Sequence, residues 1–165
     1  GSGAVWSLSS NKLRPRGWTS ADAAGLPILP GLLRYDEVVA GEIRHALRFT
    51  APTTRRAYVW PARHHAGSTS SRAYPPMGAW FRLKSSYSTQ GYSRDAKVVL
   101  AAMKRHGMIL ADNGSPWYFQ GTSDRRWTGG VADDAFVTGQ YAILAIMPIN
   151  AVACGWHHQA GWPGH

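Results

Sequence analysis

The chain has 165 residues, the size of one ordinary domain, and is long enough to bury a hydrophobic core. Its apolar fraction of 44% excludes a disordered chain, and its single cysteine, Cys154, excludes an intrachain disulfide and a cysteine-built zinc site. Its 18 Lys and Arg against 9 Asp and Glu give a net charge of +9, which favours anionic partners.

The first predicted helix is short and runs from Tyr35 to Ala40. Gly41 follows it, and glycine is the residue type that most often ends a helix. Asp36 and Glu37 lie in the first turn, where the helix dipole favours carboxylates. We therefore interpret this acidic pair as structural rather than catalytic.

The next two runs are rich in strand-forming residues and predict a β-hairpin, with strands at Ile43–Thr50 and Ala57–Trp60. The turn between them is expected at Pro52–Thr54, because proline presets φ and threonine can bond its own backbone. In such a hairpin His45 and His64 lie toward the same end. This is the best candidate site that the sequence offers.

A half-buried strand is predicted at Trp80–Lys84 from its alternating pattern, and a helix at Ser93–His106. Ser93 is a suitable N-cap, and Gly107 follows the basic last turn. We expect this one long helix to pack on a sheet.

Two further strands are predicted at Met108–Ala111 and Trp117–Gln120, joined by a turn at Asp112–Ser115. The turn contains Asn113-Gly114, the strongest short hairpin signal in the chain. The sequence therefore predicts an α+β fold with a mainly antiparallel β-sheet, sandwich or barrel-like, and one long helix packed on it.

The longest apolar run, Tyr141–Ile149, is far too short to span a membrane, so no membrane partner is expected. It is also too apolar to remain exposed. We expect it to pack as a strand against the core or to pair across a homodimer.

Several long stretches match one protein family in the same order along the chain. They include "SNKLRPRGWTSADAAGLPILPGLLRYDEVVAGEIRHALRFT", "YVWPARH", "PPMG" followed by "FRLK", and "VLAAMKRHGMILADNGSPWYFQGTSDRRW". Together these stretches resemble a family of uncharacterised secreted proteins from soil bacteria, over about residues 1–127. The resemblance implies a secreted protein, extracellular or in the cell wall. It implies no particular reaction.

Two differences from that family affect the domain prediction. Its members carry an additional N-terminal portion with strands of its own, and no run of this chain has the pattern of a signal peptide. The tail at 128–165 also diverges. We interpret residues 1–127 as a β-rich family-like region and residues 128–165 as a divergent tail of the same domain.

The candidate catalytic residues are His45, His64 and Asp112. Two histidines with a nearby carboxylate can act as a general base with its orienting group. The alternative is structural, with hydrogen-bonded histidines and Asp112 as a turn residue. No cofactor motif is present, so no cofactor is expected, although His45 and His64 could bind a divalent metal instead.

Three function classes agree with these features. The first is a polysaccharide-active hydrolase of glycosidase type with His and Asp acid-base chemistry, and the second is a non-catalytic carbohydrate-binding module. The third, a basic nucleic-acid-binding protein, has no recognition motif and is disfavoured by export. The expected substrate-binding residues for a polysaccharide are Arg48, Trp60, Lys84, Asn113 and Trp117.

Overall fold

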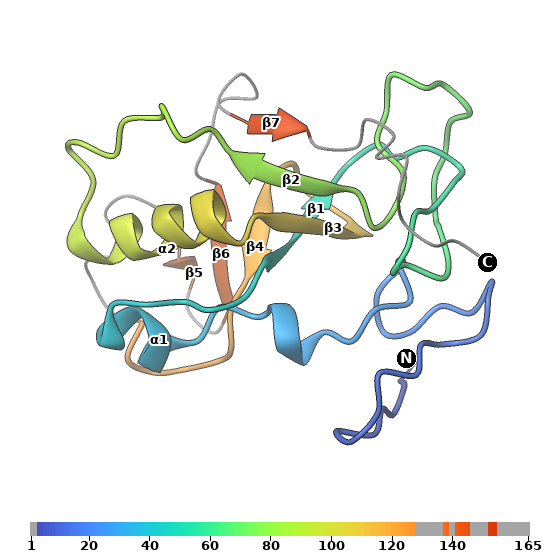
Figure 1. Cartoon of the computed structure of the whole chain (residues 1–165), viewed down its shortest axis with the longest axis horizontal. Helices are drawn as coiled ribbons and strands as arrows, with labels where there is room; N and C mark the ends of the chain where they lie inside the picture. The colour runs from blue at the N-terminus through green and yellow to red at the C-terminus, as the bar shows by residue number, and fades with distance from the viewer. Residues whose placement is uncertain (1–2, 128–136, 139–140, 146–151, 155–165) are drawn as a thin grey trace.

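The computed structural model describes residues 3–127, 137–138, 141–145 and 152–154 (Figure 1). In chain order its elements are a 3₁₀ turn η1 (Leu29–Gly31), α1 (Tyr35–Ala40), β1 (Leu47–Ala51), β2 (Trp80–Leu83), α2 (Arg94–Arg105), β3 (Met108–Asn113), β4 (Tyr118–Gln120), β5 (Val137–Thr138), β6 (Tyr141–Ala145) and β7 (Val152–Cys154).

The strands form one sheet in the order β5-β6-β4-β1-β3-β2-β7. At its centre β1 runs parallel to β3, and the other described neighbours pair antiparallel. The predicted α+β class is therefore confirmed. The finer prediction, a mainly antiparallel sheet of sandwich or barrel-like form, is corrected, because the described strands form one mixed sheet in which β1 and β3 are parallel.

The expected hairpin at Asn113-Gly114 does not form, because β1 lies between β3 and β4. The backbone N–H of Gly114 donates to the Ala51 carbonyl at 3.1 Å, and that of Trp117 donates to the Thr50 carbonyl at 3.0 Å. The turn residues therefore carry the chain around the end of β1 instead of folding β3 back on itself.

The hairpin expected from Ala57–Trp60 is also absent. Both edges of β1 are occupied by β3 and β4, so no edge remains for a further strand. The segment instead makes one isolated bridge, between Tyr58 and Met77, and the Val59 N–H donates to the Met77 carbonyl at 2.9 Å.

Both helices lie where local signals predict them. α1 ends at Gly41, whose φ is 84°, and the Ser93 hydroxyl accepts the Ala96 N–H at the start of α2. α2 has 12 residues, an ordinary length for a helix in a globular protein, so the expectation of a long helix is corrected. Its buried residues, among them Val99 and Met103, join the core.

The alternation of β1 divides the sheet into two faces. Leu47 and Phe49 point to the hydrophobic core, while Arg48 and Thr50 point to the opposite face. The segment before α1 covers that second face, since a Cβ placed on Gly31 would lie 3.1 Å from the Arg48 Cβ.

The described elements separate into two ends (Figure 1). We call the end that contains α1 and α2 the helical end. The loop end lies across the sheet from it and contains the segments 14–26 and 52–78.

The first part of the apolar run in the tail forms β6 and pairs with β4. The rest of that run, Ile146–Ile149, lies outside the described residues, as do His157, His158 and His165. Among the described residues, no helix combines the length and hydrophobicity needed to cross a bilayer.

Candidate functional site

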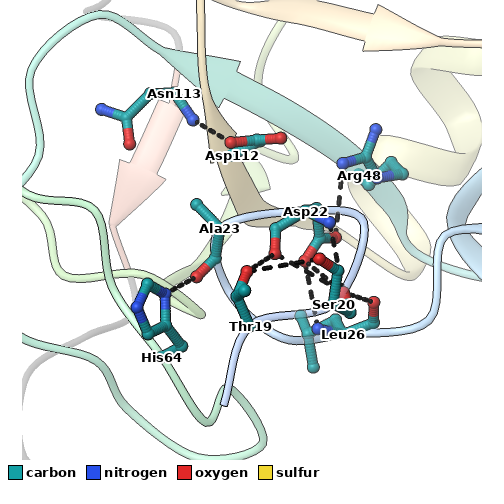
Figure 2. Close-up of polar contacts among 9 residues, drawn as sticks. All are labelled: Thr19, Ser20, Asp22, Ala23, Leu26, Arg48, His64, Asp112 and Asn113. Atoms are coloured by element: carbon teal, nitrogen blue, oxygen red, sulfur yellow. Dashed lines mark hydrogen bonds and ion pairs between the residues drawn. The ribbon is translucent and has the colours of Figure 1, made fainter. Parts of the chain in front are cut away.

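The loop Thr19–Leu26 is closed by its own polar groups (Figure 2). The Ser20 hydroxyl donates to the Leu26 carbonyl at 2.7 Å, and the Leu26 N–H donates to Asp22 Oδ1 at 3.1 Å. The Thr19 hydroxyl donates to the Asp22 carbonyl at 2.7 Å. Asp22 therefore organises a rigid loop from inside.

Asp22 also makes a buried ion pair with Arg48 of β1. Arg48 Nη2 lies 3.3 Å from Asp22 Oδ2, and the two side chains are only 4% and 0% exposed. Burial raises the pKa of the Asp22 carboxyl above its ordinary 3.8, against the opposing attraction of the Arg48 guanidinium. Arg48, expected to bind substrate, is thus turned inward and fastens the loop to the sheet.

Two of the predicted catalytic residues, His64 and Asp112, lie next to this loop because the backbone of Ala24 bonds to the segments that carry them. The Ala24 N–H donates to the carbonyl of Ala111, the residue before Asp112, at 2.9 Å. The Ala24 carbonyl accepts the His64 N–H at 3.3 Å. Figure 2 shows His64 and Asp112 flanking the loop, although they come from distant parts of the chain.

The tautomer of His64 follows from its hydrogen bond. His64 Nδ1 lies 2.8 Å from the Ala23 carbonyl, and a carbonyl can only accept, so Nδ1 carries a proton. Nε2 has no hydrogen-bond partner among the described residues. A half-buried imidazole oriented through Nδ1 can gain and release a proton at Nε2, which is the arrangement that general acid-base catalysis requires.

His45 has a different environment and is not brought to His64. Its Nδ1 lies 2.9 Å from the Ala46 carbonyl and its Nε2 lies 3.1 Å from Glu37 Oε2. Both ring nitrogens of His45 therefore have a neighbour within the protein, the Ala46 carbonyl and the Glu37 carboxylate. The second oxygen of Glu37 pairs with Arg34. His45 ties α1 to the chain that enters β1, and the two histidines share no partner.

Asp112 and Asn113 end β3 beside the loop. Asp112 Oδ1 accepts the Asn113 N–H at 2.8 Å, which matches the structural interpretation of a turn residue. Asn113 Nδ2 donates to the Thr54 hydroxyl at 3.3 Å, whereas its Oδ1 is buried with no hydrogen-bond partner among the described residues. A buried oxygen of this kind can accept a hydrogen bond from an internal water molecule.

The two tryptophans expected under sugar rings differ in exposure. Trp117 stacks on Phe49 with ring centroids 5.2 Å apart and an interplanar angle of 4°, and it meets Phe81 edge-on. Trp117 thus packs on the core. Trp60 is 63% exposed.

Lys84 follows β2 and lies at the opposite end of the β2-β3 pair from Asp112. The antiparallel register pairs Trp80 with Ile109 and Phe81 with Met108, so the end of β2 continues past the start of β3. Asp112 lies toward the other end of β3. Lys84 and Asp112 therefore do not share a site.

Two hollows lie at the helical end. One, of about 380 Å³, lies between the segment after α1 and α2, and the other, of about 490 Å³, is lined by charged residues of α1 including Glu37. The described residues contain no cluster of three or more His, Cys, Asp or Glu side chains that could hold a metal ion.

Asp22 was missed by the sequence interpretation, although a signal for it exists. It is one charged residue inside the apolar stretch "ADAAGLPIL", and Arg48 stands equally alone inside the strand "ALRFT". Two isolated opposite charges in buried segments indicate that they pair, because an unpaired buried charge is very costly.

Comparison with protein families, with curated proteins and with solved structures finds no match for this chain. The relation to secreted soil-bacterial proteins therefore stays a prediction, and the geometry around His64 carries the functional argument.

Proposed function

We propose that the protein is a secreted hydrolase of polysaccharides whose acid-base pair is His64 and Asp112. The observation that supports this is their placement on either side of Ala24, with His64 oriented by the Ala23 carbonyl and Nε2 left for proton transfer. A proton-transfer pair fixed by backbone contacts is held without reorganisation during the reaction.

In the proposed reaction the Asp112 carboxylate takes a proton from water, whose oxygen attacks the anomeric carbon. The imidazolium of His64 donates its Nε2 proton to the glycosidic oxygen as the carbon–oxygen bond breaks. The Nδ1 hydrogen bond to Ala23 persists in both protonation states, so the ring keeps its orientation throughout.

Trp60 is the proposed sugar contact, because its side chain is 63% exposed and an indole ring can stack on a sugar. The buried Oδ1 of Asn113 is out of reach of a sugar hydroxyl, so Asn113 serves to hold the end of β3 through Thr54. Arg48 is buried and Trp117 is half-buried against the core, so we assign both to supporting this region of the sheet.

A second candidate function is a non-catalytic carbohydrate-binding module. The 63% exposure of Trp60 favours it, because a sugar ring can stack on such a side chain without any acid-base group. Under this alternative, polysaccharide is bound and no product is released.

The test measures release of reducing ends from a panel of neutral and acidic polysaccharides, with and without a chelator. His64→Asn keeps a donor for the Ala23 carbonyl but removes the titrating nitrogen. We expect it to lower the rate by at least about 100-fold with little change in Tm.

His45→Asn is the matched control, since His45 is engaged with Glu37 and Ala46, and we expect it to retain activity. Equal losses in both variants would contradict the assignment of His64. Binding without release would favour the module, and release abolished by the chelator would replace the metal-free mechanism with a metal-dependent one.

A further inference from the structure

The loop end is almost free of acidic residues. No Asp or Glu occurs between Glu42 and Asp95, and Asp22 is the only acidic residue before Tyr35. Asp22 is fully buried against Arg48, so it contributes no negative surface charge. Asp112, at the proposed catalytic site, is the other carboxylate in this region.

The helical end has the opposite character, because its acidic residues are matched by arginines. The ion pairs there are Arg34–Glu37, Arg44–Glu42, Arg105–Glu42, Arg94–Asp95, Arg126–Asp36 and Arg126–Asp124. The arginines of the loop end other than Arg48, by contrast, have only the Asp112 carboxylate among the described acidic residues of that end.

Two arginines of the loop end are fixed by contacts between distant segments. Arg63 Nε donates to the Arg14 carbonyl at 2.9 Å, and the Gly17 N–H donates to the Arg63 carbonyl at 2.7 Å. The Arg14 guanidinium lies 5.2 Å from the ring centroid of Trp18. These contacts join the N-terminal segment to the residue that precedes His64.

Three further arginines, Arg16, Arg56 and Arg72, are exposed. The Arg56 N–H donates to the Thr69 carbonyl at 2.7 Å, which packs the segment around Arg56 against the loop that carries Arg72. None of the three has a carboxylate partner among the described residues. With Arg14 and Arg63 they form what we call the basic loop surface.

We propose that the substrate is an acidic polysaccharide whose uronate carboxylates bind the basic loop surface while a glycosidic bond lies at His64. This inference rests on the proposed function and names its substrate class. The argument is charge complementarity beside the acid-base pair, because guanidinium groups match carboxylates with two parallel hydrogen bonds. A neutral glucan would leave these arginines unused.

The test measures Kd for polygalacturonate, for a neutral xylan and for single-stranded DNA at low and moderate salt. The variant Arg16→Gln/Arg56→Gln/Arg72→Gln removes three exposed charges and no buried contact. We expect polygalacturonate to bind it about tenfold more weakly, at roughly 0.5 kcal/mol for each exposed contact. Binding to the unaltered protein should weaken as salt rises.

The control variant is Arg82→Gln/Lys97→Gln/Arg125→Gln, which removes three exposed charges away from the loop end. It should bind polygalacturonate almost as the unaltered protein does. Equal losses in the two variants would show that only net charge matters and would overturn the inference. Preference for DNA over polygalacturonate would overturn it in favour of nucleic acid.

The two proposals fail in different ways. Hydrolysis of neutral xylan with no affinity for polygalacturonate would overturn the acidic substrate and leave the hydrolase in place. Binding of polygalacturonate, lost in the loop-end variant, together with no released product from any polymer, would support the surface and overturn the hydrolase.

Discussion

The ion pairs at the two ends of the molecule differ in how deeply they are buried. At the helical end the ion pairs are at least partly exposed, as in Asp124 with Arg126, whose side chains are 19% and 54% exposed. Hydrogen bonding to Arg126 lowers the pKa of Asp124 to about 2. At the loop end Asp22 and Arg48 are buried together, and burial raises the pKa of Asp22. An aspartate–arginine pair is thus part of the surface at the helical end and part of the interior at the loop end.

The largest expected effect tests this contrast through the two aspartates. Asp22→Ala leaves Arg48 as an unpaired buried charge and should lower the unfolding free energy by about 3–5 kcal/mol. Asp124→Ala removes a partly exposed pair and should lower the denaturation midpoint much less than Asp22→Ala does. The measurement is urea-induced unfolding of both variants.

A double variant distinguishes the loss of the ion pair from the cost of leaving one buried charge unpaired. Asp22→Leu/Arg48→Met should recover most of the stability that Asp22→Ala loses, because both charges then leave the interior together. If the double variant is as unstable as Asp22→Ala, the loop depends on the hydrogen bonds of Asp22 more than on the ion pair.

The second prediction compares one glycine from each end. Gly41 and Gly78 both have positive φ, 84° and 80°, which disfavours any other residue. A Cβ on Gly41 would meet only Arg94 Nη2, at 3.9 Å, whereas one on Gly78 would lie 2.5 Å from the Val59 carbonyl oxygen. Gly41→Ala should cost about 1 kcal/mol, and Gly78→Ala more than about 2 kcal/mol.

The check is thermal unfolding of the two alanine variants under one set of conditions. Equal Tm values would contradict the idea that close backbone contacts stabilise the loop end. A lower Tm for Gly41→Ala than for Gly78→Ala would contradict it as well.

The smallest expected effect concerns pH. Burial raises the pKa of Asp22 in the folded state above the ordinary value of 3.8. At a pH between 3.8 and the folded pKa, Asp22 therefore binds a proton more often in the folded state than in the unfolded state. The contribution of Asp22 to stability is therefore most favourable below 3.8 and falls as pH rises through the folded pKa, by at most about 1.4 kcal/mol per pH unit.

The measurement for this prediction is the difference in unfolding free energy between the unaltered protein and Asp22→Leu/Arg48→Met, followed upward from pH 3.8. A difference that stays constant or grows with pH would contradict the raised pKa. Other acidic groups cancel in this comparison, because both proteins contain them.

Local signals in the sequence were sufficient for the helices. The boundaries of α1 and α2 depend on Gly41 and on the Ser93 cap, which act within one turn of their own positions. The strands at Trp80 and Met108 were likewise indicated by patterns within a few residues.

Strand pairing could not be predicted in the same way. The Asn113-Gly114 signal indicates a tight turn but does not specify which strand lies beside it, and here β1 takes that place. The arrangement of the candidate site could not be predicted from local signals either. His64 and Asp112 were identified as residue types, but their placement on either side of Ala24 depends on its backbone groups, which give no signal in a sequence.

The central position of β1 also has a consequence for biosynthesis. Leu47 pairs with Met108 and Phe49 pairs with Phe119, so neither partner of β1 exists when β1 leaves the ribosome. The growing chain must carry two unpaired strand edges, flanked by buried apolar side chains, until β4 has been made. The sheet of this protein can therefore be completed only late in synthesis. The nascent chain is the state most in need of protection from association with other chains.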